Sequence, residues 1–212
     1  MTRKQRLDAI MPILADEYPD ARCLLDYGGD PFRLLIATIL AAQTTDESVN
    51  RVTKTLWPRF PGPAALAAAD RTELERIVHP LGFFRNKSRR ISEASRHVLE
   101  RHGGVVPDNM EDLLEIPGTG RKTANVVLGE AFGQPAIIVD THVKRLSGRI
   151  DLSRRTDPDG IERDLMRLVP SADRTDFSHR LGFHGRRVCK ARAPACRSCP
   201  IAGYCPRRGL ES

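Results

Sequence analysis

The chain has 212 residues, of which 40% are hydrophobic, which is enough for a buried core in one compact body or two small lobes and argues against disorder. Lysine and arginine outnumber aspartate and glutamate by 34 to 27, and the net charge of +7 favours a polyanionic partner, either nucleic acid or an acidic membrane surface. Residues 1–20 mix charged and apolar side chains unlike a signal peptide, and the longest apolar run, Leu34 to Ala42, is too short to cross a bilayer, so we expect a soluble cytoplasmic protein.

The first predicted element is an amphipathic helix on the outside of the molecule. One of its faces carries the apolar residues Leu7, Ile10, Met11, Leu14 and Tyr18. Asp30 before Pro31 then places a capping side chain ahead of a proline at the first helical position. The helix that follows, to Ala42, is apolar on most sides and should be buried.

Helical periodicity continues along the rest of the chain. Further helices are predicted at residues 47–59, 71–79, 87–101, 110–115, 121–132, 141–149, 157–168 and 173–183. The one β-branched run, Ile137 to Val139, is too short for a sheet and predicts an extended entry into the helix at Thr141. The sequence therefore predicts an all-α fold, and without a low-complexity linker any division into lobes must come from packing.

A tight turn between two helices is predicted at Leu113 to Ala124, which reads Leu-Leu-Glu-Ile-Pro-Gly-Thr-Gly-Arg-Lys-Thr-Ala. Gly118 and Gly120 permit the positive φ angles and close backbone approach that such a turn needs. Backbone N–H groups at the start of the second helix, aided by its dipole, could hold a DNA phosphate without reading bases. Proline and glycine alone would equally support an ordinary helical hairpin, but the adjacent Arg121 and Lys122 favour DNA binding.

Lys122 is either a phosphate contact or a nucleophile. An amine attacks a sugar carbon only when neutral, and a free lysine is protonated at neutral pH. The helix N-terminus and Arg121 both disfavour a second positive charge, and partial burial would act in the same direction. A carboxylate is the natural partner, and Asp140 is the candidate, although an N-cap is the simpler role for it from spacing alone.

Four of the five cysteines crowd the C-terminal segment. They are Cys189, Cys196, Cys199 and Cys205, in the pattern C-x6-C-x2-C-x5-C. Four thiolates suit zinc or an iron-sulfur cube; zinc sites usually use two short C-x2-C pairs, so the single pair here favours a [4Fe-4S] cluster, with two disulfides as a minor alternative. Cys23 stands apart and is expected to be a small buried hydrophobe.

The cysteine segment is also strongly basic. Its cations are Arg186, Arg187, Lys190, Arg192, Arg197, Arg207 and Arg208, and no acidic residue occurs between Phe177 and Leu210. Charge compensation of an anionic cluster would explain some of them, but their number suits contact with phosphates.

Taken together, the hairpin, the segment Val-Asp-Thr-His-Val-Lys-Arg and the cysteine pattern resemble the endonuclease III family. Leu-Ala-Ala-Gln-Thr-Thr-Asp from Leu40 and Gly-Phe-Phe-Arg-Asn-Lys from Gly82 also look like family segments, so the resemblance covers nearly the whole chain. It implies two helical lobes with a DNA-binding cleft between them. Residues 24–133 would form a six-helix barrel with a helix-hairpin-helix motif, and residues 1–23 and 134–212 the iron-sulfur cluster lobe.

The resemblance also implies a role for each matching residue. Lys122 would attack C1′ of the sugar to form a Schiff base, Asp140 would assist departure of the base, and β-elimination would cut the strand. Gln43 would fill the gap left by the everted nucleotide, and Phe83 would wedge beside the orphaned base. From spacing alone, Gln43 could instead be a polar helix end and Phe83 could be core packing. The remaining implied DNA contacts are Gly118, Gly120, Arg121, His142 and Lys190.

The function implied is removal of oxidised pyrimidines from double-stranded DNA by a monomeric, nucleoid-associated glycosylase and abasic-site lyase with a [4Fe-4S] cofactor. One alternative is an adenine or mismatch glycosylase of the same superfamily, although such relatives generally lack a lysine at position 122. Another is a non-enzymatic module that only binds damaged DNA. Many relatives have an aliphatic residue in place of Phe83 and a valine in place of Thr119.

Overall fold

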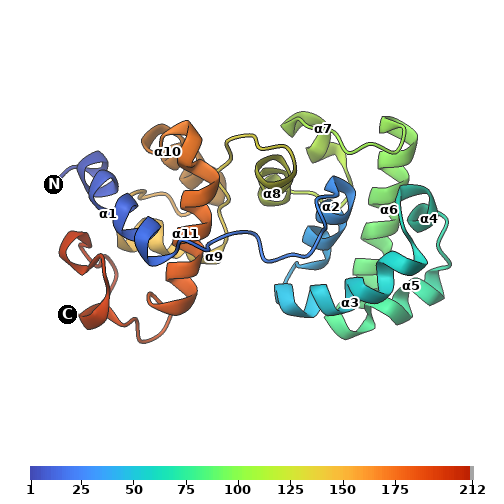
Figure 1. Cartoon of the computed structure of the whole chain (residues 1–212), viewed down its shortest axis with the longest axis horizontal. Coiled ribbons are helices and arrows are strands. Elements are labelled where there is room, and N and C mark those ends of the chain that lie inside the picture. Colours follow the sequence, from blue (N-terminus) through green and yellow to red (C-terminus); the bar gives the residue numbers. More distant parts are fainter. Residues whose placement is uncertain (211–212) are drawn as a thin grey trace. The chain divides into compact units, whose positions relative to one another are not determined.

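The computed structural model describes residues 1–210, and every regular element in that range is helical, which confirms the predicted all-α class (Figure 1). The chain divides into two compact units. The middle unit is Leu24–Gln134, and the terminal unit joins Met1–Cys23 to the chain from Pro135 onward. No helix in the described part of the chain is long and apolar enough to span a membrane.

The middle unit is built around one buried helix. Its elements are α2 (Pro31–Leu40), α3 (Asp46–Arg59), α4 (Pro63–Ala67), α5 (Arg71–Val78), the 3-10 turn η1 (His79–Leu81), α6 (Phe84–His102), α7 (Met110–Glu115) and α8 (Arg121–Ala131). Helix α2 packs against α3, α6 and α8, and the burial predicted for it is confirmed. Asp30 caps it by accepting from the backbone N–H of Phe32 at 2.8 Å. Fully buried leucines such as Leu34 and Leu35 each stabilise this core by about 1.5–3 kcal/mol.

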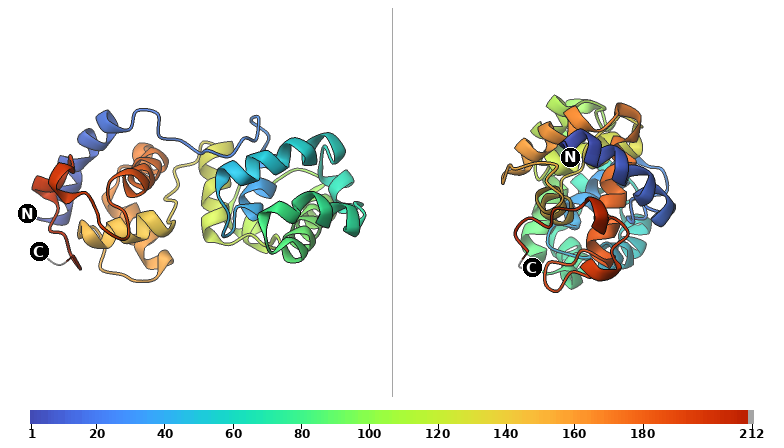
Figure 2. Two further views of the ribbon diagram at one scale, coloured as in Figure 1. Left: turned by 90° about the horizontal axis from the view of Figure 1, so that it is seen from below. Right: turned by 90° about the vertical axis from the view of Figure 1, so that its left-hand side faces the viewer.

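The terminal unit packs α1 (Arg3–Glu17) against helices from the other end of the chain. These are α9 (Thr141–Arg149), α10 (Pro158–Leu168) and α11 (Arg174–Arg187), followed by the short turns η3 (Cys196–Ser198) and η4 (Ala202–Tyr204). Figure 2 shows α1 beside the C-terminal segment, and α1 contacts α11, α10 and η4. Leu7, Ile10 and Leu14 of α1 are fully buried in a core shared with α11, so the predicted apolar face is confirmed.

The β-branched run lies extended against α11 and forms no strand, as predicted. Ile138 donates its backbone N–H to Ser178 Oγ at 3.0 Å, and Ala136 donates to Thr175 Oγ1 at 3.3 Å. Side-chain hydroxyls of a helix thus take the place of a partner strand for these buried backbone donors.

Three features differ most from the prediction. Helix α4 was not predicted, because five residues are too few to show a helical period. Helix α6 begins at Phe84, three positions earlier than expected, and α11 continues to Arg187 rather than Phe183. The extension of α11 was missed because it carries His184 and Gly185, polar or small residues that nonetheless lie buried.

Candidate functional site

The predicted hairpin is present, and its two glycines play different parts. Gly118 has φ +86°, and a Cβ at this position would lie 3.4 Å from Ile39 Cγ2 and 3.5 Å from Arg90 Cβ. Gly120 has φ −101°, and a Cβ would meet nothing within 4 Å. The expected positive φ is therefore found at Gly118 only. At Gly120 the chain itself does not require glycine, and the backbone is open to an external group.

Helix α8 begins without a side-chain cap, because Gly120 occupies the N-cap position. No cap side chain therefore competes with an anion at the first turn of this helix, where the helix dipole favours negative charge. Lys122 is the second residue of α8 and is exposed, so the partial burial considered for it is not found. Arg121 beside it is half-buried.

Gln43 and Phe83 share an uncommon backbone conformation, with φ of +56° and +46°. Both side chains are exposed, and Phe83 is 68% exposed, so core packing is excluded for Phe83. The neighbouring Phe84 is the one that packs, with its ring centroid 4.6 Å from that of His79. Left-handed backbone at residues other than glycine costs about 1–3 kcal/mol and concentrates at functional sites.

Asp140 lies at the start of α9 in the terminal unit. Its Oδ1 accepts from the backbone N–H of Val143 at 2.7 Å, which makes it the N-cap that its spacing suggested. The side chain is half-buried, and its other oxygen takes no part in the cap. A carboxylate fixed in this way keeps one oxygen for a second task.

His142 is wedged between α9 and α11. A Cβ at Gly185 would lie only 2.7 Å from His142 Cβ, so glycine allows the two helices to approach. The ring Nδ1 lies 3.1 Å from Arg145 Nη2. Burial lowers the pKa of His142 below its usual value, and the nearby Asp140 carboxylate partly opposes this shift.

The four C-terminal cysteines line one cavity of the terminal unit, together with His184, Arg149 and Ile201. These four are free thiols, so no disulfide forms among them. Burial raises the pKa of Cys199, and the neighbouring thiols add to the rise. Cys23 is only half-buried, so the expectation that it would be a buried hydrophobe is wrong.

The comparisons with known proteins point to one family. Residues 36–171 match the HhH-GPD superfamily of base excision DNA repair proteins. The chain is 53% identical to endonuclease III of Synechocystis sp., over 97% of this chain and 94% of that protein, and 42% identical to endonuclease III of Bacillus subtilis over the same shares. The chain belongs to the endonuclease III family. A solved structure of a trapped covalent intermediate between an endonuclease III and DNA superposes on this family member with a TM-score of 0.92, at 41% identity over 98% of this chain and 97% of that one.

In this endonuclease III family member, two arginines of α9 hold the start of the cysteine segment, and the sequence analysis missed both. Arg145 Nη2 donates to the backbone carbonyls of Gly185 and Cys189, each at 2.9 Å. Arg149 donates to the sulfur of Cys189 at 3.4 Å and to the carbonyl of Lys190 at 2.7 Å. The side chain of Lys190 is exposed. Arg145 and Arg149 lie four residues apart on one face of α9, and this spacing was the signal available in the sequence.

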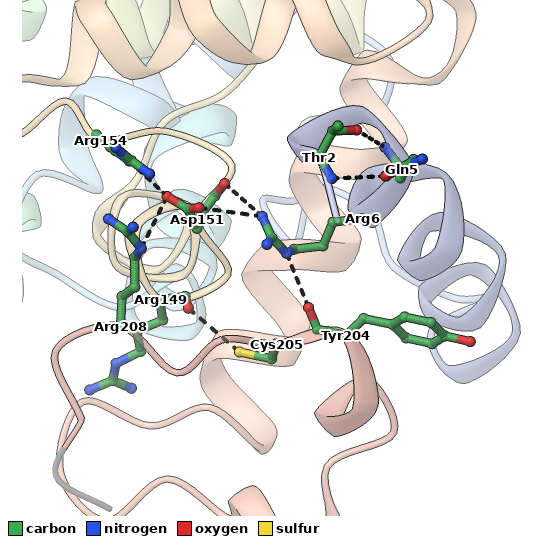
Figure 3. Close-up of polar contacts among 9 residues, drawn as sticks. All are labelled: Thr2, Gln5, Arg6, Arg149, Asp151, Arg154, Tyr204, Cys205 and Arg208. Carbon is green, nitrogen blue, oxygen red and sulfur yellow. Dashed lines mark hydrogen bonds and ion pairs between the residues drawn. The ribbon is translucent and has the colours of Figure 1, made fainter.

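A buried carboxylate, which the sequence analysis also missed, joins the two ends of the terminal unit (Figure 3). Asp151 contacts Arg6 of α1 at 3.5 Å, Arg154 at 3.1 Å and Arg208 at 3.2 Å. Arg6 in turn donates from Nε to the carbonyl of Tyr204 at 3.1 Å. We call this set the Asp151 cluster. It fastens the cysteine segment to the N-terminal helix.

Proposed function

We propose that this chain is a bifunctional DNA N-glycosylase and abasic-site lyase of base excision repair, acting as a monomer on oxidised pyrimidines in double-stranded DNA of the nucleoid. One observation carries the proposal: an exposed lysine, Lys122, stands in the first turn of an uncapped helix directly after the hairpin. The near full-length similarity to endonuclease III proteins, one of them trapped covalently on DNA, supports it.

In the proposed reaction, the nitrogen of Lys122 bonds to C1′ of the everted nucleotide while the bond from C1′ to the base breaks. The base leaves with a proton, and the C1′–O4′ bond of the sugar ring then opens as O4′ takes up a proton, which leaves a protonated imine between the lysine and C1′. Loss of a proton from C2′ then expels the 3′ phosphate oxygen by β-elimination. Asp140 would use the carboxylate oxygen outside the α9 cap to take up a lysine proton and to stabilise positive charge on the sugar.

The hairpin would supply binding that does not depend on sequence. A phosphate would meet the open backbone at Gly118 and Gly120 and the first N–H groups of α8, with Arg121 adding charge. The exposed Lys190 would add a phosphate contact from the cysteine segment, and His142 is proposed to contact DNA from the start of α9.

Gln43 and Phe83 would enter the duplex beside the everted nucleotide. Among the residues of the middle unit other than glycine, these two have a left-handed backbone, and both side chains are exposed. Inserted side chains of this kind offset the cost of unstacking, which is lowest for a damaged base that pairs poorly.

The residues of the C-terminal cavity fit a [4Fe-4S] cluster held by Cys189, Cys196, Cys199 and Cys205. Each of these cysteines is a free thiol, and its deprotonated form, the thiolate, would bind iron. Among the described residues no group of three or more His, Cys, Asp or Glu side chains is arranged to hold a single metal ion. The cysteine spacing supports the cluster over zinc, because it has one short C-x2-C pair, whereas zinc sites usually use two.

A buried histidine adds to the fit. His184 Nδ1 lies 2.9 Å from Tyr18 Oη, and its Nε2 lies 3.5 Å from Cys199 Sγ. A neutral His184 that accepts from the tyrosine would offer its Nε2–H to the sulfur, as a thiolate ligand requires. When bound, the cluster would order the cysteine segment. It would take no part in the steps at the sugar, which Lys122 and Asp140 would perform.

Borohydride trapping tests the proposal. Wild-type protein incubated with duplex containing thymine glycol or an abasic site should form a covalent complex on reduction, and Lys122→Ala should form none. Lys54→Ala removes another exposed lysine, on α3, and should trap like wild type. A wild-type protein that binds abasic duplex without trapping would instead be a non-enzymatic damage-binding module. Excision of adenine without a trapped complex would indicate the mismatch glycosylase.

A further inference from the structure

A buried lysine joins the two turns that carry Gln43 and Phe83. Lys87, in the first turns of α6, is only 4% exposed. Its Nζ donates to Thr44 Oγ1 and to the carbonyl of Leu81, the latter at 3.0 Å. Thr44 Oγ1 donates to the same Leu81 carbonyl at 3.0 Å. The three groups form a closed triangle of hydrogen bonds, which we call the Lys87 triangle.

The triangle touches both turns next to their left-handed residues. Thr44 directly follows Gln43, and Leu81 is separated from Phe83 only by Gly82. Lys87 also donates its backbone N–H to the carbonyl of Phe83 at 3.0 Å. A left-handed backbone persists only where its surroundings fix it. One lysine therefore supplies part of that constraint to both positions.

The fold alone gives little reason to bury an ammonium group here. Both acceptors of Lys87 Nζ are neutral, and no carboxylate of the described residues pairs with it. Burial accordingly lowers the pKa of Lys87. A buried charge without a countercharge costs stability, which a neutral or apolar residue would avoid. Such a cost is expected where a residue serves function rather than folding.

We propose that Lys87 is a positioning residue, which holds the Gln43 turn and the Phe83 turn at a fixed spacing so that both side chains can enter the duplex together. This inference rests on the proposed function, and specifically on the insertion of Gln43 and Phe83. Lys87 does not touch the reacting atoms; it acts through the two turns.

If Lys87 positions the two turns, replacing it should lower activity on fully paired DNA but not on single-stranded DNA. Lys87→Met should slow single-turnover excision of thymine glycol from a fully paired duplex by about tenfold to a hundredfold, as expected when inserting groups shift by about 1 Å. Borohydride trapping on single-stranded abasic DNA needs no eversion and should change by less than about threefold. A 2-aminopurine placed opposite the lesion should brighten less with the variant, because the wedge no longer unstacks it.

Thr44 offers a matched pair of variants that leaves the lysine in place. Thr44→Val removes the hydroxyl at nearly constant shape and should reproduce the duplex-specific loss, while Thr44→Ser keeps the hydroxyl and should act like wild type. This pair decides the case even if Lys87→Met does not fold.

Equal losses on paired and single-stranded DNA, or equal rates for Thr44→Val and Thr44→Ser, would overturn the positioning role and leave the proposed function standing. A wild-type protein that forms no trapped complex on either DNA would overturn the proposed function, and this inference with it.

Discussion

The Asp151 cluster should contribute a large part of the stability of the terminal unit. The variant Asp151→Asn measures this contribution. Asp151 has φ +59°, a conformation that asparagine also tolerates, so this variant changes the charge with little effect on backbone strain. The side chains of Asp151 and Arg6 are only 11% and 9% exposed, whereas those of Arg154 and Arg208 are 62% and 48% exposed. The buried Arg6 pair therefore dominates.

The magnitude follows from these contacts. Breaking a buried ion pair costs about 3–5 kcal/mol, and each half-exposed pair adds less than about 1 kcal/mol. Asparagine keeps a neutral acceptor, and Arg6 still donates to the backbone carbonyl of residue 151 at 3.1 Å. We therefore expect a loss of stability at the lower end of this range. A loss of about 3 kcal/mol lowers the Tm of a protein of this size by about 6–12 °C.

Thermal unfolding followed by circular dichroism, with Asp8→Asn as control, tests this value. Asp8 pairs with Lys4 on the same helix, but both side chains are half-exposed, so Tm should fall by less than about 2 °C. Equal Tm values for the two variants would refute the reasoning.

The fall in the free energy of unfolding at low pH gives a second measure of the Asp151 cluster. Burial alone would raise the pKa of Asp151, but the Arg154 hydrogen bond and the charges of Arg208 and Arg6 outweigh it and hold the pKa below its usual value. The stabilisation is thus present above a pH of about 4 and lost as the pH falls through the folded-state pKa. Asp151→Asn should lose this part of the acid dependence.

Three further predictions test the hairpin and the cysteines. Gly118→Ala should lower Tm by about 2–8 °C because alanine is strained at φ +86°, whereas Gly120→Ala should leave Tm within about 2 °C and weaken binding to abasic duplex in a filter assay. Thr119→Val should raise Tm by about 2–4 °C, because the buried Thr119 hydroxyl has no hydrogen-bond partner among the described residues; an unchanged Tm would contradict this. Cys199→Ala should lose iron and acid-labile sulfide on purification and Cys23→Ala should keep both, and zinc in place of iron would exclude the cluster.

Most of the fold could be predicted from signals between residues that lie close together in the sequence. Asp30 precedes a helix and caps it through the hydrogen bond that its position predicted, and the structure shows the same kind of cap at Asp70 and Asp157. The turn at Gly118 was equally local. These features could be predicted because the donor, the acceptor and the change of direction all lie within a few residues.

Long-range features could not be predicted in the same way. Asp151 meets Arg6 and Arg208 only after both ends of the chain have packed, and nothing near Asp151 in the sequence marks it as buried. Lys87 was quoted within a family segment, but its partners Thr44 and Leu81 come from other elements. Phe83 is exposed and has a left-handed backbone, and no neighbouring residue in the sequence signals either feature.

Several costs to stability in the middle unit fall in the segments to which function is assigned, although Asp151, Ala193 and Arg207 of the terminal unit also have a left-handed backbone. Gln43 and Phe83 have a strained backbone, Lys87 buries an ammonium among neutral groups, and Gly120 leaves the first turn of α8 without a side-chain cap. The remaining helices begin mostly with well-formed caps, and their cores are closely buried, so they can offset these costs. Selection for stability alone would remove all four features by single substitutions. Their presence in one unit is what the proposed task requires, which is to hold an opened DNA duplex beside Lys122.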